Sequence, residues 1–248
     1  MAPESRINGV PARGTLVTVG VLGLAVVGAW ALMLGPLRTS GMGSASPAAA
    51  GVLFMTTWLV MLVAMMVPSV TPMAVAYQRI TAARPNGAVL VAVFVFGYLV
   101  VWAAAGLIPL AFNLALPDLQ MRIGTGTWWR LAAVTLAAVG VYQLSPAKIA
   151  CLKSCRSPVG FFMTHDFGAG SIGALRFGGL HGAICLGCCW ALMGLIVVIG
   201  AMSAGWMAVL AILFIAEKYW RYGVALSRVV GAGSLVAAAA LLVTGWTP

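Results

Sequence analysis

The most restrictive feature of this sequence is a series of apolar runs, each of bilayer-spanning length, separated by short polar segments. A spanning helix needs about 20 apolar residues, and only helices and closed barrels satisfy their backbone hydrogen bonds in lipid. The runs are continuous and lack the alternating pattern of barrel strands. Hydrophobic residues make up 62% of the chain and charged residues 7%, which excludes an ordinary soluble domain. The sequence therefore predicts an all-α, polytopic transmembrane helix bundle.

The apolar runs predict about seven spans within a single transmembrane helical domain, residues 15–248, which follows a short cytoplasmic arm, residues 1–14. The connection 145–176 is the longest polar segment and is predicted to be a cytoplasmic loop that carries two cysteines. Pro68 and Pro72 are expected to kink the second span. The sixth run is short, and if it is re-entrant the chain has six spans. The expected spans are 16–34, 51–77, 88–116, 128–144, 177–202, 204–220 and 229–246.

The basic residues predict the orientation of the chain. With a cytoplasmic amino terminus and seven spans, three of the 14 basic residues (Arg38, Arg122 and Arg130) fall outside and the rest inside. Cytoplasmic segments of membrane proteins carry an excess of lysine and arginine. We therefore expect a multi-pass protein of the bacterial cytoplasmic (inner) membrane with its amino terminus in the cytoplasm. The basic residues lie between apolar blocks, so the lipid bilayer is the expected partner. Other membrane subunits are a further expected class of partner, and nucleic acid is not expected.

The fifth apolar run carries an unusual density of metal-ligating residues. His181, Cys185, Cys188 and Cys189 stand at positions i, i+4, i+7 and i+8, so a helix places all four on one face. Thiolate and imidazole ligands suit Cu(I) or Zn(II), whereas a single cysteine in a membrane helix is usually a small apolar residue. This run also contains several glycines. Small residues allow helices to pack closely, so the second, fourth or sixth span is expected to lie against the cysteine-bearing face.

Further soft ligands are expected near this stripe. Cys151 and Cys155 are four residues apart, so a helix there would place both on one face, near the mouth of the fifth span. Cytoplasmic thiols stay reduced, which favours metal or redox chemistry over structural disulfides. Met65 and Met66 lie at the same predicted depth as Cys188, and thioethers beside thiolates select Cu(I) over harder ions. Methionines at helical spacing are also ordinary core residues.

Two charged pairs are candidates to support the site. Glu217 follows an unbroken apolar run, and we expect it to anchor the cysteine region by a salt bridge to Lys218, Arg221 or Arg156. Lys218 is expected to extend toward the lipid headgroups. The adjacent pair His165 and Asp166 in the long connection could bind metal or relay protons, or lie solvated. These four residues, Glu217, Lys218, His165 and Asp166, form the predicted second layer.

Four segments of the chain resemble an uncharacterised bacterial family of predicted metal-binding integral membrane proteins. They are WLVMLVAMMVPS in the second span, PAKIACLKSCRSP at 146–158, CLGCCWALM at 185–193, and Glu217–Lys218. The resemblance covers roughly residues 51–218 and excludes the first and last spans. It implies a multi-pass membrane protein whose metal role is carried by Cys151, Cys155, Cys185, Cys188 and Cys189.

Three functional hypotheses follow from these patterns. The first is a protein that binds a soft metal, copper in preference to zinc or iron, for metal handling or delivery. The second is a non-catalytic accessory subunit of a larger membrane enzyme complex, such as a copper-dependent membrane monooxygenase. The third is a membrane thiol-redox protein. No nucleophile with a base and no nucleotide motif is present, and four acidic residues argue against two-metal hydrolysis, so no catalytic residues are predicted.

Overall fold

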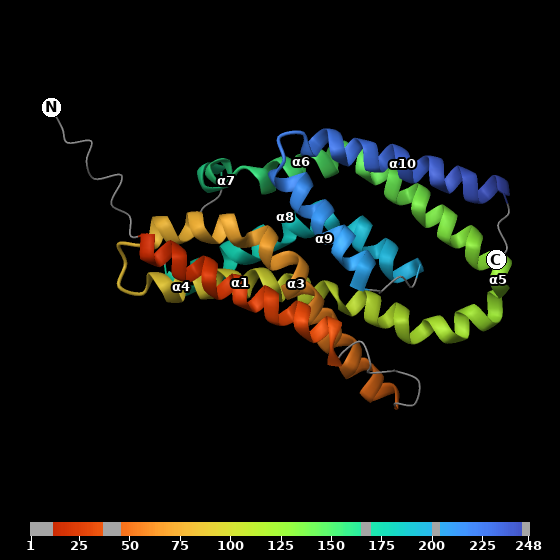
Figure 1. The fold of residues 1–248 in the computed structure, drawn as a ribbon, viewed down its shortest axis with the longest axis horizontal. Helices are drawn as coiled ribbons and strands as arrows, with labels where there is room; N and C mark the ends of the chain where they lie inside the picture. The colour runs from red at the N-terminus through yellow and green to blue at the C-terminus, as the bar shows by residue number, and fades with distance from the viewer. Residues whose placement is uncertain (1–11, 37–45, 165–169, 200–203, 245–248) are drawn as a thin grey trace.

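The computed structural model describes residues 12–36, 46–164, 170–199 and 204–244, and these residues form helices with no strand among them (Figure 1). The predicted all-α class is thereby confirmed. The helices are α1 (Ala12–Leu34), α3 (Pro47–Thr81), α4 (Gly87–Ala105), α5 (Leu107–Leu144), α6 (Pro146–Arg156), α7 (Pro158–Thr164), α8 (Gly170–Ile199), α9 (Ala204–Tyr219) and α10 (Gly223–Thr244).

Five segments of the described chain are long and apolar enough to cross a membrane, and a sixth is the bent pair formed by the end of α5 and α6. The seven spans expected from the sequence include α9 as well. At 16 residues, α9 is shorter than the roughly 20 residues that a bilayer crossing requires. Length and composition therefore support five or six spans, which agrees with the six-span alternative.

Helix α3 continues through two prolines. Ser46 caps its first turn, while Pro68 and Pro72 lie inside it, and the helix changes direction along its length (Figure 1). Because Pro72 has no N–H group, the carbonyl of Pro68 loses its usual helical partner. The hydroxyl of Tyr219, at the end of α9, lies 3.0 Å from this carbonyl and 2.9 Å from that of Ser69, so its one proton is shared between the two acceptors. The proline thus creates an acceptor through which α9 is attached to α3.

A sharp bend after α5 brings α6 back against the bundle. The axes of the two helices differ by 60°, and Pro146 at the first position of α6 follows Ser145, whose hydroxyl accepts from the backbone N–H of Lys148 at 3.2 Å. Serine as cap and proline at the first position favour a helix start. Most of the connection 145–176 is therefore helical, and it is not an open loop, since Leu152 on α6 is fully buried.

Helices α4 and α8 approach closely at glycines. A Cβ atom on Gly178 of α8 would overlap the carbonyl of Phe94, and one on Gly97 of α4 would overlap the carbonyl of Leu175. Small residues on both helices allow their backbones to come together. The third span, α4, was not among the spans expected to approach α8. The expected approach of the sixth and fourth spans is nevertheless found, since Lys218 of α9 contacts Cys185 at 3.0 Å and Tyr142 of α5 donates to the carbonyl of Gly187.

Candidate metal centre

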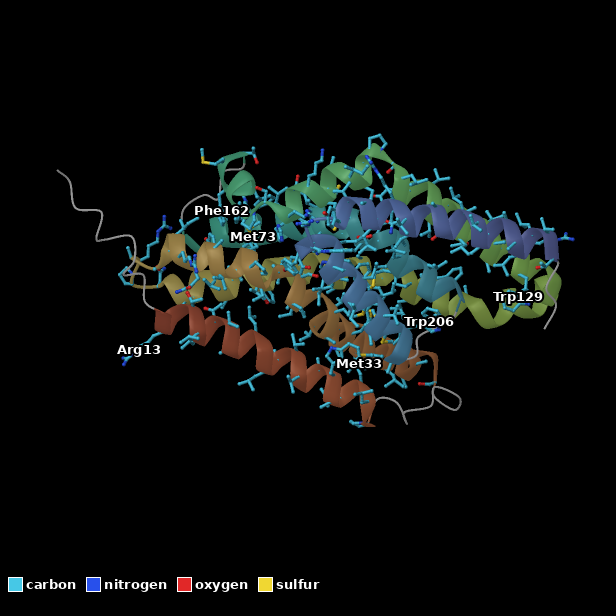
Figure 2. All side chains as sticks on the ribbon, turned by 45° about the horizontal axis from the view of Figure 1, so that its top comes forward. Arg13, Met33, Met73, Trp129, Phe162 and Trp206 are labelled. Atoms are coloured by element: carbon cyan, nitrogen blue, oxygen red, sulfur yellow. The ribbon has the colours of Figure 1, made fainter. Side chains whose placement is uncertain are left out.

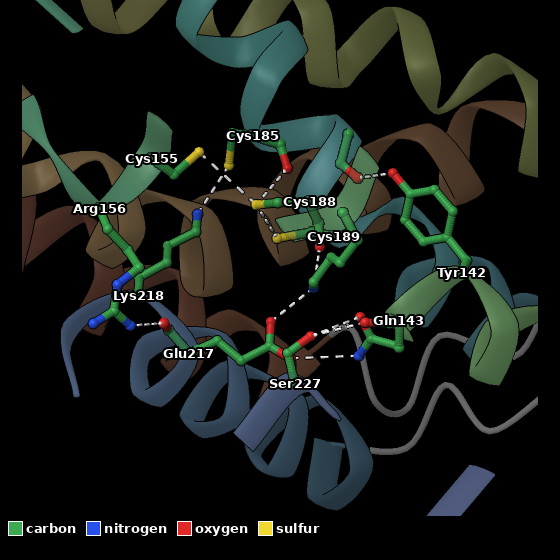
Figure 3. A network of polar contacts seen from close by, with 12 residues as sticks. Tyr142, Gln143, Cys155, Arg156, Cys185, Cys188, Cys189, Glu217, Lys218 and Ser227 are labelled. Carbon is green, nitrogen blue, oxygen red and sulfur yellow. Dashed lines mark hydrogen bonds and ion pairs between the residues drawn. The ribbon is translucent and has the colours of Figure 1, made fainter. Parts of the chain in front are cut away.

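Three cysteines from two helices converge at the junction of α6 and α8 (Figure 3). The Sγ atoms of Cys155, Cys185 and Cys188 all lie within 4.8 Å of one another. Those of Cys155 and Cys188 are 3.9 Å apart. All three residues are free cysteines. The helical spacing on α8 and the bend before α6 together produce this three-sulfur cluster, by which we mean these three residues throughout.

The two remaining cysteines lie beside the three-sulfur cluster without belonging to it. The Sγ atom of Cys189 is 3.3 Å from that of Cys188, and both residues are buried. Cys151 is half-buried one turn before Cys155, against α8, where a Cβ on Gly187 would lie 2.9 Å from the Cys151 sulfur. The structure thus gathers the five predicted cysteines in one region.

Two polar side chains from other helices contact the sulfur of Cys185. The ammonium group of Lys218 on α9 donates to it at 3.0 Å, and the hydroxyl of Tyr98 on α4 lies 3.0 Å away. The expectation that Lys218 extends to the headgroups was wrong, since the residue is 4% exposed and its ammonium meets a thiol in the core. A charge-assisted hydrogen bond of this kind stabilises a thiolate.

A buried ion pair supports the other side of the cluster. The carboxylate of Glu217 pairs with Lys148 of α6 at 2.8 Å, and both side chains are inaccessible to solvent. Lys148 also donates to the backbone carbonyl of Cys188, and Gln143 donates to the carboxylate at 3.4 Å. Glu217 does form a salt bridge near the cysteines. Its partner differs from the three residues expected, of which Arg156 instead donates to its backbone carbonyl.

His181 lies one helical turn from Cys185 but outside the three-sulfur cluster. It is 2% exposed, and its Nδ1 atom has no hydrogen-bond partner. Its ring is surrounded by aromatic rings, with the centroid of Phe161 at 5.2 Å, of Tyr98 at 5.8 Å and of Phe94 at 6.2 Å. The Nδ1 atom of this buried histidine is therefore left without a hydrogen bond within the described chain.

The predicted methionine ligands are core residues. Met65 and Met66 are both fully buried on α3, and the carbonyl of Met66 accepts a long hydrogen bond from the Tyr98 hydroxyl at 3.5 Å. Tyr98 thereby links the backbone of α3 to Cys185. The role of these thioethers as ligands stays a prediction, and His165 and Asp166 lie outside the described residues.

Sequence reasoning missed Tyr98 and Lys148. Lys148 precedes Cys151 by three residues and Cys155 by seven, so the three share one face of α6. That spacing was a usable signal, because a carboxylate as deep as Glu217 requires a cation. For Tyr98 the sequence shows only a hydroxyl within an apolar run. A buried hydroxyl needs a hydrogen-bond partner, but the sequence does not indicate which one.

The chemistry of the three-sulfur cluster favours a soft ion. Thiolates select copper(I) and zinc, whereas hard ions require oxygen ligands. Among the residues that the structure describes, no other group of histidine, cysteine or acidic side chains converges in this way. The cluster, one buried ammonium and one buried ion pair together form an environment suited to binding a metal cation through sulfur.

A comparison with protein families agrees with this chemistry. The model of a family described as PpoB2, copper chaperone, matches residues 55–241, a range that contains all five cysteines, His181, Glu217 and Lys218. No curated protein and no solved structure matches the chain. The expected resemblance to a metal-binding membrane family is consistent with this finding. Because the match covers well over half of the sequence, the chain belongs to the PpoB2 copper chaperone family.

Proposed function

We propose that this protein carries Cu(I) as cargo on Cys155, Cys185 and Cys188 and delivers it to a partner protein. The observation that carries the proposal is the convergence of these three sulfur atoms within 4.8 Å. If metal–sulfur bonds are about 2.3 Å long, a trigonal site has sulfur–sulfur separations of about 4.0 Å. The Cys155–Cys188 separation of 3.9 Å already satisfies this requirement.

Charge balance supports a monovalent ion with two thiolates and one thiol. Such a complex has a net charge of −1, and the ammonium of Lys218 beside Cys185 compensates it. Glu217 and Lys148 neutralise each other in the adjacent ion pair. A buried site with nearly no net charge avoids the large cost of transferring an uncompensated charge from water.

The exposure of the cysteines supports a cargo role. Cys185 and Cys188 are buried, whereas Cys155 is only partly so. A chaperone must release its ion by exchanging ligands with a partner, and one ligand nearer the surface allows that exchange to begin. A resident structural metal would instead favour a closed set of ligands.

We place the protein in the cytoplasmic membrane with its amino terminus inside. Arg13 lies at one end of the bundle and Trp129 near the opposite end (Figure 2). The last turn of α3 and the short turn before α4 add Arg79 and Arg84, respectively, to the end at which Arg13 lies. Basic residues collect on the cytoplasmic side and tryptophans at membrane interfaces. This orientation would expose the half-buried Cys155 to cytoplasmic Cu(I).

The test is the metal content of the full chain, purified in mild detergent under reducing conditions. We expect about one copper per chain, measured by elemental mass spectrometry, in line with one trigonal sulfur site. Replacing Cys155, Cys185 and Cys188 with serine should abolish it, whereas Cys151→Ser, which alters a thiol outside the cluster, should retain it. Zinc or iron in place of copper would refute the proposed cargo. A metal-free chain that copurifies with a stoichiometric subunit would instead support the accessory-subunit hypothesis.

A further inference from the structure

His181 has the character of an unused metal ligand. Buried polar atoms are almost always hydrogen-bonded, so an imidazole nitrogen without a partner requires an explanation. The surrounding rings of Phe94, Tyr98 and Phe161 offer no acceptor in the ring plane, and the residue is almost inaccessible. Phenylalanine would fill this space without an orphaned nitrogen.

The position of His181 relates it directly to the three-sulfur cluster. It precedes Cys185 by four residues on α8, so the two side chains are neighbours on one helix face. An imidazole nitrogen and a thiolate on successive turns can share one two-coordinate Cu(I). Cys185 is therefore a member of two ligand sets, one with the other sulfurs and one with His181.

We propose that His181 holds the copper together with Cys185 during transfer, so that Cys155, the ligand nearer the surface, is freed to begin the exchange with the partner; this inference rests on the proposed function. In the transfer step a Cu–N bond to His181 forms while the Cu–S bonds to Cys155 and Cys188 break. Cys185 stays bound throughout. Copper remains Cu(I), so no electron is exchanged, and any thiolate released from the ion takes up a proton from water at the partly exposed Cys155.

The aromatic rings give the transfer position its selectivity. Phe161 on α7 and Phe94 on α4 cover the imidazole together with Tyr98, and the pair Phe161–Phe177 has centroids 4.9 Å apart. This apolar cover excludes water, an oxygen ligand that harder ions require. Cu(I) is soft and weakly hydrated, so it gives up less hydration free energy than a harder ion when it enters such a site.

The experiment compares transfer rate with binding equilibrium. Wild-type protein and the variant His181→Phe, which fills the aromatic space without a nitrogen, are loaded with Cu(I) and mixed with bicinchoninate in a stopped-flow instrument. We expect both to bind one copper per chain, with dissociation constants that agree within about threefold. The transfer rate should fall about tenfold or more in the variant. Cys151→Ser, a substitution outside both ligand sets, should transfer copper at the wild-type rate.

An unchanged transfer rate in a folded His181→Phe protein would overturn the inference and leave the proposed function intact. A wild-type chain that binds no copper would instead refute the proposed function itself. If His181→Phe does not fold, X-ray absorption of copper-loaded Cys188→Ser tests the same idea. That variant weakens the sulfur set, so we expect a nitrogen scatterer at about 2.0 Å beside the Cys185 sulfur. A spectrum with sulfur neighbours alone would contradict the inference.

Discussion

Lys218 is a buried cation whose one hydrogen-bond partner in the described part of the chain is the sulfur of Cys185, at 3.0 Å. Replacing it with methionine keeps the volume and removes the charge. A hydrogen bond to a charged group contributes about 1.5–3 kcal/mol, so Lys218→Met should weaken Cu(I) binding by about 10- to 100-fold. Competition with a Cu(I) chelator measures this change. Lys218→Arg keeps the charge and should lose less Cu(I) affinity. An equal loss of affinity in both variants would contradict the electrostatic account.

Glu217 illustrates how strongly a buried charge depends on its partner. In Glu217→Gln the ammonium of Lys148 remains buried without its carboxylate 2.8 Å away. Breaking a buried pair on one side costs about 3–5 kcal/mol, so the melting temperature in detergent should fall markedly. The double variant Glu217→Gln with Lys148→Met removes both charges and should recover much of this loss. If the single variant melts at the wild-type temperature, the pair contributes little to the fold.

At the scale of helices, the attachment of α9 to α3 depends on a proline. The hydroxyl of Tyr219 is shared between the Pro68 carbonyl, which Pro72 leaves without a helical partner, and the adjacent Ser69 carbonyl. Tyr219→Phe should therefore reduce the free energy of unfolding by about 1 kcal/mol. In a Pro72→Ala background, the backbone N–H of residue 72 can donate to the Pro68 carbonyl. Tyr219→Phe should then reduce the free energy of unfolding by a smaller amount. Thermal unfolding of the four proteins in detergent checks this, and a cost that is equal in both backgrounds would contradict it.

The helical arrangement follows from the sequence more readily than the site does. Apolar runs and turn residues locate the long helices, and the spacing on the fifth run places Cys185 and Cys188 on one face. The bend at Ser145 and Pro146, which brings Cys155 to them, is a tertiary feature, because whether a proline starts a packed helix or an open loop depends on what lies beside it. The same reason explains why Lys148 was not recognised as the partner of Glu217.

At the scale of the whole molecule, the direction of α9 decides on which side the chain ends. The start of α1 and the end of α10 lie at opposite ends of the long axis (Figure 1). Six spans would place both termini in the cytoplasm, whereas this arrangement favours a crossing by α9 despite its short length, so we expect the carboxyl terminus to lie outside the cytoplasm. A carboxyl-terminal alkaline phosphatase fusion should be active and a green fluorescent protein fusion dark, because the first requires export and the second folds in the cytoplasm. The reverse pattern would show that α9 does not cross the membrane.

Because the three-sulfur cluster joins two helices, copper bound there as proposed would act on the whole chain as a reversible crosslink. An ion held by Cys155 on α6 and by two sulfurs on α8 ties together segments that the bend after α5 otherwise only brings into contact. A ligand at a hundred times its dissociation constant stabilises the folded state by about 2.7 kcal/mol. We therefore expect the empty chain to be the form that membrane proteases degrade first. The abundance of the protein in the cell should then follow the supply of copper.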